Sequence, residues 1–396
     1  MAIAVETFLP TITTLETAES LDALAGSWNA LSAEVPFRSH EWLTNWWRHY
    51  GGSSRRLFVV ALRDSAGQLI GLAPWYIERV PGSGRVVRFL GSGVVCSDYL
   101  SLLCLPGHEG EVARHLASWL TDAAARDWDQ LEFSGVAHDD GALPSLIEHL
   151  AADGQLTDQR LDCHCWRTEL PADWEGFLAG LSSSRRQRTR TLLRRSIDSG
   201  RVALREVENV EDLEYAFPLL IDLHQKRRRS LGQAGCFANR QFTDFHREVS
   251  RAMLAAGTLR MLWLELAGHP IAVEYGFVGG KTIYYYQGGF DPAAADDRPG
   301  WLCFGASLRR AIEQGYQAFD FLRGDESYKG SWRADSQPML QYRVFGRGTS
   351  AQVRRAAWHT TQSARRFVRG CRAALASKVR TGGANPPRDG KNDRPE

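Results

Sequence analysis

Four polar side chains that could transfer protons or hold an anion lie close together at positions 325–329. Asp325, Glu326, Tyr328 and Lys329 follow the stretch 319–322, whose alternating pattern predicts a strand. Loops after such strands commonly carry site residues in open sheets. A lysine beside a carboxylate can orient an anion, and a tyrosine can supply a proton. The loop therefore predicts acid–base chemistry, although a solvated charged loop would use the same residue types.

One further carboxylate could act as a base. Glu274 lies within the run Ile271–Val278, which is predicted to be a strand. Alternate residues of a strand point to opposite faces, so Glu274 would face either a cleft or solvent. The first arrangement makes it a proton acceptor, and the second makes it an ordinary surface residue.

An anion site is predicted where a strand leads into a helix. The run Thr282–Gln287 reads as a strand, and apolar residues from Leu302 to Gly315 follow helical spacing. Proline and glycine at 299 and 300 suit the first turn of that helix, whose N-terminus would attract negative charge. The entry is acidic, however, since Asp296 and Asp297 would repel phosphate unless they turn away or cap the helix.

Composition and length restrict the class of protein. At 396 residues the chain predicts two domains, each with its own core. The 43% hydrophobic and 24% charged fractions are typical of soluble globular proteins. No apolar run approaches the roughly 18 residues that span a bilayer, and no signal-peptide pattern opens the chain, so we expect a cytoplasmic protein.

The cysteines favour neither a disulfide framework nor a metal centre. Seven of them are scattered along the chain, an odd count that fits a reducing compartment. Cys163, His164 and Cys165 are too close together for the usual paired zinc ligands. We therefore predict a strand at these positions and no metal site.

Positive charge gathers at the C-terminus. Residues 346–396 hold twelve Lys or Arg against three Asp or Glu, which leaves the remainder of the chain net acidic. Helical spacing predicts a basic amphipathic helix over 347–380, followed by a disordered tail over 381–396. The helix would pack on the acidic body, lie on an anionic membrane surface or contact a polysaccharide synthase. Nucleic acid is not the expected partner of such an acidic body.

A second basic run, 185–195, reads as a helix with arginines on most of its faces. It is interpreted either as a solvent-exposed helix or as a contact for a phosphorylated donor or tRNA. No aromatic residues interleave with these arginines as they do in many nucleic-acid-binding segments.

The order of predicted elements repeats. Both 1–164 and 165–346 show helices, three consecutive β runs, a further helix and a closing strand. In the first half the β runs are Leu57–Leu62, Leu69–Tyr76 and Val86–Leu90, and in the second they are Leu259–Leu266, Ile271–Val278 and Thr282–Gln287. The fold class is therefore mixed α/β, with two duplicated domains.

The motifs at these positions resemble a known family. The stretches 266–275, 288–292, 298–300 and 319–332, together with 37–47 and 97–100, are similar to the GNAT-related acyltransferases of the CelD-like type. The resemblance covers most of 35–345. It implies two tandem GNAT-like domains, as in the FemABX aminoacyl ligases, each with a mixed, mainly antiparallel sheet flanked by helices. CelD-like members are associated with cellulose or other exopolysaccharide production.

The resemblance also implies a donor and an acceptor. An acyl-CoA, with acetyl-CoA the expected one, would donate its acyl group to a saccharide-related or small amine acceptor. Glu274, Asp325, Glu326, Tyr328 and Lys329 are the predicted catalytic residues. Donor binding is predicted for six residues: Gln287, Gly288, Gly289, Arg298, Pro299 and Gly300, with the two strand glycines admitting the pantetheine arm.

Two alternatives stay open at this point. The stretch 291–300 departs from the glycine-rich loop that a GNAT places before this helix, and FemABX-like proteins share such departures. One alternative is therefore an aminoacyl-tRNA-dependent ligase. The other is a catalytically inert GNAT-like scaffold within a polysaccharide-producing assembly.

Overall fold

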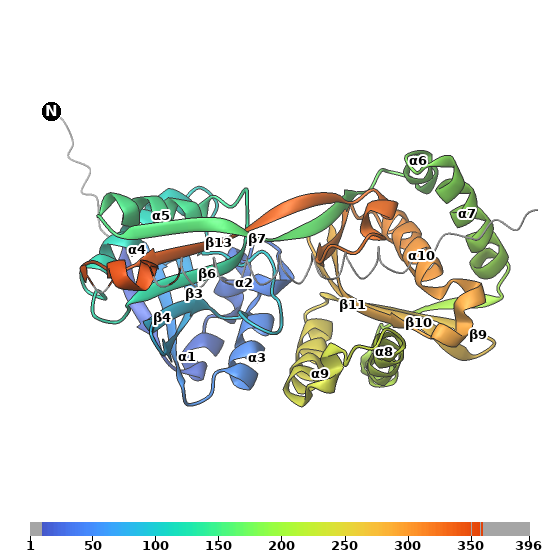
Figure 1. The fold of residues 1–396 in the computed structure, drawn as a ribbon, viewed down its shortest axis with the longest axis horizontal. Coiled ribbons are helices and arrows are strands. Elements are labelled where there is room, and N and C mark those ends of the chain that lie inside the picture. The colour runs from blue at the N-terminus through green and yellow to red at the C-terminus, as the bar shows by residue number, and fades with distance from the viewer. Residues whose placement is uncertain (1–9, 350, 357, 359–396) are drawn as a thin grey trace, which may run out of the picture.

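One thirteen-stranded mixed sheet runs through the whole molecule. The computed structural model describes residues 10–349, 351–356 and 358. Twelve strands follow the order β1-β2-β3-β4-β6-β13-β7-β12-β11-β10-β9-β8, and β5 pairs with β3 off this path. Helices cover the sheet in two lobes (Figure 1). The predicted mixed α/β fold with two similar halves is confirmed.

The N-terminal half begins with helices and continues as a meander. Ser39 caps α3 by accepting a hydrogen bond from the Trp42 N–H, as its position before the helix predicts. Trp42, Trp46 and Tyr50 all lie in the core. The elements of this half are β1 (Thr11–Leu15), α1 (Ala18–Asp22), α2 (Ala25–Leu31), α3 (His40–Tyr50), β2 (Arg55–Arg63), β3 (Leu69–Val80), β4 (Gly84–Phe89), β5 (Leu103–Cys104), α4 (Glu109–Thr121), β6 (Gln130–Ala137) and α5 (Ala142–Ala152).

The C-terminal half repeats the plan with longer helices. α8 and α9 cover one face of its sheet, and α10 lies on the other (Figure 1). Its elements are β7 (Leu156–Glu169), α6 (Trp174–Ala179), α7 (Ser183–Leu193), the π-helical η2 (Arg194–Asp198), β8 (Val202–Glu206), α8 (Val210–Ser230), η3 (Cys236–Ala238), α9 (Arg240–Ala255), β9 (Leu259–Leu266), β10 (His269–Gly279), β11 (Thr282–Phe290), η4 (Pro292–Asp297), α10 (Pro299–Glu313), β12 (Ala318–Arg323), η5 (Lys329–Trp332) and β13 (Asp335–Phe345).

Two long strands join the halves. β7 and β13 pair along eleven positions and span both lobes in Figure 1. β13 also pairs with β6 of the first half, and β7 with β12 of the second. The predicted domain boundary at residues 164 and 165 falls inside β7, and it stays a prediction.

Several elements differ from the sequence expectations. The apolar pattern from Leu21 to Leu31 predicts one helix, but this region holds two short helices, α1 and α2, separated by a turn. The strands β8 and β13 and the helix α5 were not predicted. Of the predicted C-terminal helix, residues 351–356 are helical. Most of it, and the whole predicted tail over 381–396, lie outside the described residues.

The two halves share one hydrophobic core. Trp42 of α3 contacts Phe245 of α9 edge-to-face at 5.2 Å and Phe277 of β10 at 5.3 Å between ring centroids. Phe37 packs in the same manner on Phe277 and Tyr284. Aromatic contacts of this kind bury large apolar areas between the halves. Within the described residues, no helix is long and apolar enough to cross a membrane.

The strands β11 and β12 separate part of the way along their length. They pair in parallel from Thr282 to Tyr284 only, opposite Ala318 to Asp320. On its other side, β11 pairs with β10 up to Phe290 and shifts register next to Tyr286. Residues 285–290 therefore leave β12 while they remain attached to β10. The separation opens a space above α10.

Candidate functional site

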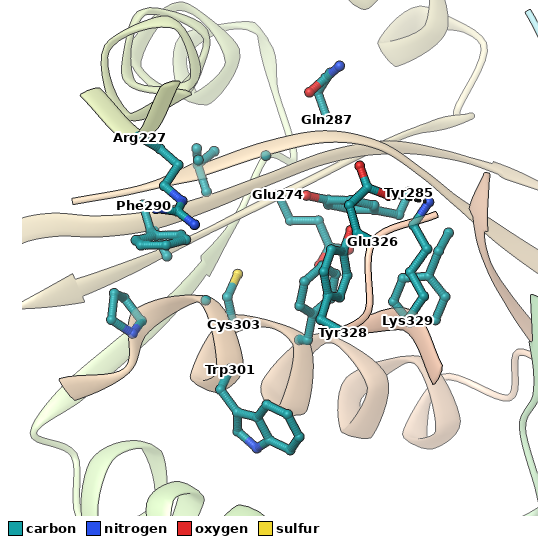
Figure 2. A pocket seen from close by; sticks show the side chains of 18 of the residues that line it. Arg227, Glu274, Tyr285, Gln287, Phe290, Trp301, Cys303, Glu326, Tyr328 and Lys329 are labelled. Atoms are coloured by element: carbon teal, nitrogen blue, oxygen red, sulfur yellow. Dashed lines mark ion pairs between the residues drawn. The ribbon is translucent and has the colours of Figure 1, made fainter. Parts of the chain in front are cut away.

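A cavity of about 760 Å³ occupies the space between β11, the start of α10 and the loop after β12. Figure 2 shows Glu274, Tyr285 and Tyr328 converging on one another inside it. Ten of the eleven predicted site residues line the cavity: Glu274, Gln287, Gly288, Gly289, Arg298, Pro299, Gly300, Glu326, Tyr328 and Lys329. Asp325 does not line it and is exposed to solvent.

Glu274 is a buried carboxylate with one oxygen left unpaired. Its Oε1 accepts hydrogen bonds from Ser307 Oγ at 2.8 Å and from Arg260 Nη1 at 3.1 Å. Its Oε2 has no partner among the described residues. Burial raises the pKa of Glu274, and the Arg260 guanidinium and the Ser307 hydroxyl oppose that rise. A buried, unpaired carboxylate oxygen at a cavity wall is placed to accept a proton.

Aromatic rings form the inner wall. Tyr328 stacks on Phe304 of α10 with 5.2 Å between ring centroids, and Tyr285 meets the same ring edge-on at 5.0 Å. Burial raises the pKa of both tyrosines, and for Tyr285 the neighbouring Tyr328 and Glu274 add to the rise. Each hydroxyl therefore stays protonated at neutral pH and can donate a hydrogen bond into the cavity.

Lys329 is committed to the protein itself. Its Nζ donates to the carbonyls of Leu322, Arg323 and Gly324 at 3.1, 2.8 and 2.9 Å, and it lies 3.0 Å from Glu326 Oε2. An ammonium group has three protons, and three carbonyls take them. Lys329 thus holds the end of β12 and the loop in place, and its predicted role at a bound anion stays a prediction.

The start of α10 offers unoccupied backbone donors to the cavity. Arg298 is the N-cap in a left-handed conformation, and it makes no side-chain cap. Pro299 follows without an N–H, and no acidic residue lies in the first turn. The N–H groups of the first turn, together with the positive end of the helix dipole, can therefore bind an anion.

The acidic entry does not reach the cavity. Asp297 forms an ion pair with Arg201 at 2.5 Å, and neither Asp296 nor Asp297 lines the cavity wall. Arg227 and Arg228 of α8 do line it, with the Arg227 guanidinium 4.7 Å from the Phe290 ring centroid. At the start of α10, which we call the mouth of the cavity, the charged side chains that line the wall are therefore positive. The sequence alone had suggested that Asp296 and Asp297 would repel a phosphate there.

The strand glycines are required by their neighbours in the protein. A Cβ at Gly289 would lie 2.2 Å from the His224 backbone nitrogen of α8, and one at Gly288 would lie 2.5 Å from the Tyr285 hydroxyl. Gln287 contributes to the wall, and Figure 2 shows its side chain directed away from α10. The predicted approach of a pantetheine arm to this backbone stays a prediction.

Sequence reasoning missed several residues of the site. Arg260 and Ser307 hold Glu274 from β9 and α10, and their spacing in the sequence gives no hint of this contact. Arg227 lies among basic residues in the last turn of α8. Basic residues are common at the C-terminal ends of exposed helices, so the sequence does not single out Arg227 as a site residue. Tyr285 could have been predicted, because its side chain must point to the opposite face of the predicted strand from Tyr284 and Tyr286. The part of the chain that the structure describes contains no cluster of three or more metal-ligating side chains.

Comparisons with known proteins agree with this geometry. Residues 183–330 match the model of an acetyltransferase (GNAT) domain. The match runs from α7 to the loop after β12 and includes the cavity-lining residues except Trp332. The C-terminal half is therefore similar, over these residues, to a GNAT acetyltransferase domain. Among curated proteins, none matches the chain.

Solved structures are similar over nearly the full length. FemX is 12% identical, with a TM-score of 0.57 over 84% of this chain and 96% of that one. A conserved protein of unknown function from Bacteroides thetaiotaomicron VPI-5482 is 13% identical, with a TM-score of 0.52 over 85% and 100% of the two chains. At this identity the likeness shows the fold alone.

Proposed function

We propose that this protein is an acyl-CoA-dependent acyltransferase that transfers an acetyl group to the amine of a small or saccharide-related acceptor in polysaccharide biosynthesis. The observation that carries the proposal is the cavity between β11 and α10, which combines an anion-binding mouth with an aromatic interior. The diphosphate of a nucleotide needs an anion-binding environment, and the pantetheine thioester attached to it needs an apolar one. The matched GNAT domain supports the same reaction class.

The mouth of the cavity fits the phosphate groups of CoA. The α10 N-terminus would provide backbone N–H donors, while Arg227 and Arg298 would neutralise phosphate charge. Bound there, CoA would supply the thioester whose carbonyl carbon is attacked. The unpaired edge of residues 285–290 presents backbone N–H groups along the path that the thioester arm would follow.

The residues inside the cavity can manage the proton movements. Glu274 Oε2 would take a proton from the acceptor ammonium, directly or through water, to leave a neutral amine. The amine nitrogen then forms a C–N bond to the carbonyl carbon as the C–S bond breaks. Tyr328 would donate a proton to the departing sulfur, and the proton that the nitrogen loses on becoming an amide would return to the Tyr328 oxygen. CoA then leaves as its thiol, the acceptor leaves as an amide, and Glu274 releases its proton to solvent.

A thermal-shift and calorimetric titration with acetyl-CoA tests the donor. At about 100 times its Kd, a ligand that binds only the folded state stabilises it by about 2.7 kcal/mol. Arg227→Gln is expected to weaken acetyl-CoA binding about tenfold, because a charged contact to phosphate is lost. Arg229→Gln, on the exposed side of the same helix and outside the cavity lining, is the matched control.

Three outcomes separate the proposal from its alternatives. Acetyl-CoA binding with amide formation supports it. Co-purification of charged tRNA, without CoA binding, would favour an aminoacyl-tRNA-dependent ligase. Binding of neither would leave a non-catalytic scaffold. Contact of the segment 347–380 with a membrane surface or a synthase is a separate part of the proposal, and equal partitioning of the full chain and residues 1–346 with anionic vesicles would contradict it.

A further inference from the structure

The N-terminal half contains a second cavity beside the strands that correspond to β11 and β12, on the sheet face where Tyr76 of β3 packs on Trp46 of α3. β4 and β6 pair in parallel only at Val86 with Gln130 and at Val87 with Leu131. Beyond these pairs the strands separate, as β11 and β12 do in the other half. A cavity of about 340 Å³ lies there, lined by Arg88 of β4 and by Glu132 and Ser134 of β6.

The chemistry of this cavity differs from that of the first cavity. The first residues beyond the parallel pairs of β4 and β6 are Arg88 and Glu132, which form an ion pair at 3.3 Å. In the C-terminal half, the residues that follow the parallel pairs are Tyr285 and Phe321, two aromatic rings that face α10. The same separation of strands is thus polar in one half and aromatic in the other. A polar wall favours a ligand that exchanges many hydrogen bonds with it.

The charges around the second cavity are nearly balanced. Three arginines line it, and each already contacts a carboxylate: Arg55 and Arg88 contact Glu78, and Arg323 contacts Asp98. Two carboxylates, Glu132 and Asp162, also line the wall. With no excess of positive charge, the cavity is not suited to a phosphorylated compound. It is suited to an uncharged hydroxyl-bearing compound or to one that carries an ammonium group.

No helix N-terminus serves this cavity. α4 is the counterpart of α10, and its first turn carries Glu109 and Glu111, which oppose an anion. Among the described residues that line the second cavity, none comes from the start of α4. A CoA molecule therefore has no diphosphate site in this half.

Two contacts connect the second cavity to the donor strands. Arg323, at the end of β12, lines both cavities, and its Nε donates to Asp98 Oδ1 at 2.7 Å. Tyr286, in the β11 bulge, donates from its hydroxyl to the Val95 carbonyl at 2.5 Å. Val95 and Asp98 flank Cys96 and Ser97, which line the second cavity. The loop 91–98 is thereby held against the strands that would carry the thioester.

We infer that the second cavity is the acceptor site, and that the acceptor is a hydroxyl-bearing compound with one amine and no phosphate group. This inference rests on the proposed acyl transfer and adds the position and class of its second substrate. The hydroxyl groups would bond to the polar wall, and the amine would pass Arg323 to reach the thioester. The N-terminal half then supplies acceptor specificity rather than a second active site.

Three probe amines test the substrate class. Initial rates of amide formation from acetyl-CoA would be compared for glucosamine, n-hexylamine and glucosamine 6-phosphate. Glucosamine is expected to have at least a tenfold higher kcat/KM than either of the others, since each hydrogen bond that hexylamine lacks leaves a polar wall group unpaired. Equal or better use of hexylamine or of the phosphorylated sugar would overturn the inferred class.

A pair of variants on one loop tests the position. Ser92 lines the cavity, whereas Val94, two residues away, is 62% exposed and does not. Ser92→Phe should raise the KM for glucosamine at least tenfold and leave the Kd for acetyl-CoA unchanged. Val94→Phe adds the same ring to the same loop and should change neither value.

Asp162→Asn offers a second variant that does not add bulk. It should raise the KM for the cationic amine severalfold, with the Kd for acetyl-CoA unchanged. If acetyl-CoA binds and amines are acylated but Ser92→Phe and Asp162→Asn behave as wild type, the acceptor site is wrong and the proposed function stands. If acetyl-CoA does not bind, both fail.

Discussion

The two halves of this protein build different cavities from one plan. Each has a three-stranded meander, a helix and a strand parallel to the third: β2-β3-β4-α4-β6 and β9-β10-β11-α10-β12. In each half, the parallel strands separate after two or three pairs. The C-terminal separation leads to an uncapped helix N-terminus without acidic residues, and the N-terminal one does not.

The difference extends to the candidate base. Glu274 lies on the face of β10 that α10 covers, where it accepts a hydrogen bond from Ser307. In the N-terminal half, Trp75 of β3 stacks with Phe58, which stacks on Trp119 of α4, so the comparable positions facing the helix are Ala73 and Trp75. Neither side chain can accept a proton. The comparison teaches that the shared fold provides a place for a ligand, while side chains at a few positions decide what each place can do.

The largest expected effect comes from removing the candidate base. Glu274→Gln keeps the shape of the side chain but cannot accept the proton, so kcat should fall by about a hundredfold or more. In wild-type protein, the acidic limb of kcat against pH should follow Glu274, with activity rising as its raised pKa is passed. The variant should lose that limb.

Its control is Glu313→Gln at the exposed end of α10, which should leave the rate unchanged. Because Ala73 and Trp75 take the comparable places in the other half, no second base should rescue the variant. A Glu274→Gln enzyme with more than half of the wild-type kcat would contradict the comparison.

Tyr328→Phe should have a smaller effect. The ring and its stacking on Phe304 remain, and only the proton donor for the departing thiolate is lost. We expect kcat to fall about tenfold with the Kd for acetyl-CoA unchanged. Tyr316→Phe, in the same hydrophobic cluster but away from the cavity lining, provides the comparison. If a donor with a more acidic thiol were affected equally, the proton-donor role of Tyr328 would be excluded.

The smallest effect concerns the contact between the halves. Asp320 is fully buried on β12, where the Tyr99 hydroxyl of the other half donates to Oδ2. Burial raises the pKa of Asp320 from 3.8 to about 7. The stability contributed by the protonated carboxyl is therefore complete below about pH 4 and is lost as pH rises through about 7.

Asp320→Asn removes that dependence while keeping an acceptor for Tyr99. The thermal midpoint of the variant, relative to wild type, should rise by a few degrees between pH 4 and pH 8. Asp335→Asn, an exposed aspartate on β13, should show no such trend. A constant difference between Asp320→Asn and wild type across this range would show that Asp320 keeps an ordinary pKa.

Much of the fold could be predicted because it depends on local patterns. The three strands of the second meander, the helix Arg240–Ala255 and the cap at Ser39 follow from alternation, helical spacing and a single capping hydroxyl. β13 could not be predicted from its neighbours, since its partners β6 and β7 lie far away in the sequence. Such strands form because they pair with distant strands, and not because their own residues have a high strand propensity.

The sequence by itself determined which residues could do chemistry: Glu274, Tyr328 and the helix start at Pro299 were recognisable from residue type and spacing alone. Only the tertiary structure decided which of them share a cavity. It turned Asp297 toward Arg201, closed three carbonyls around Lys329 and brought Arg260 to Glu274. The physical reason is that charge and hydrogen bonding act through space, so a side chain's task depends on partners that the sequence order does not reveal.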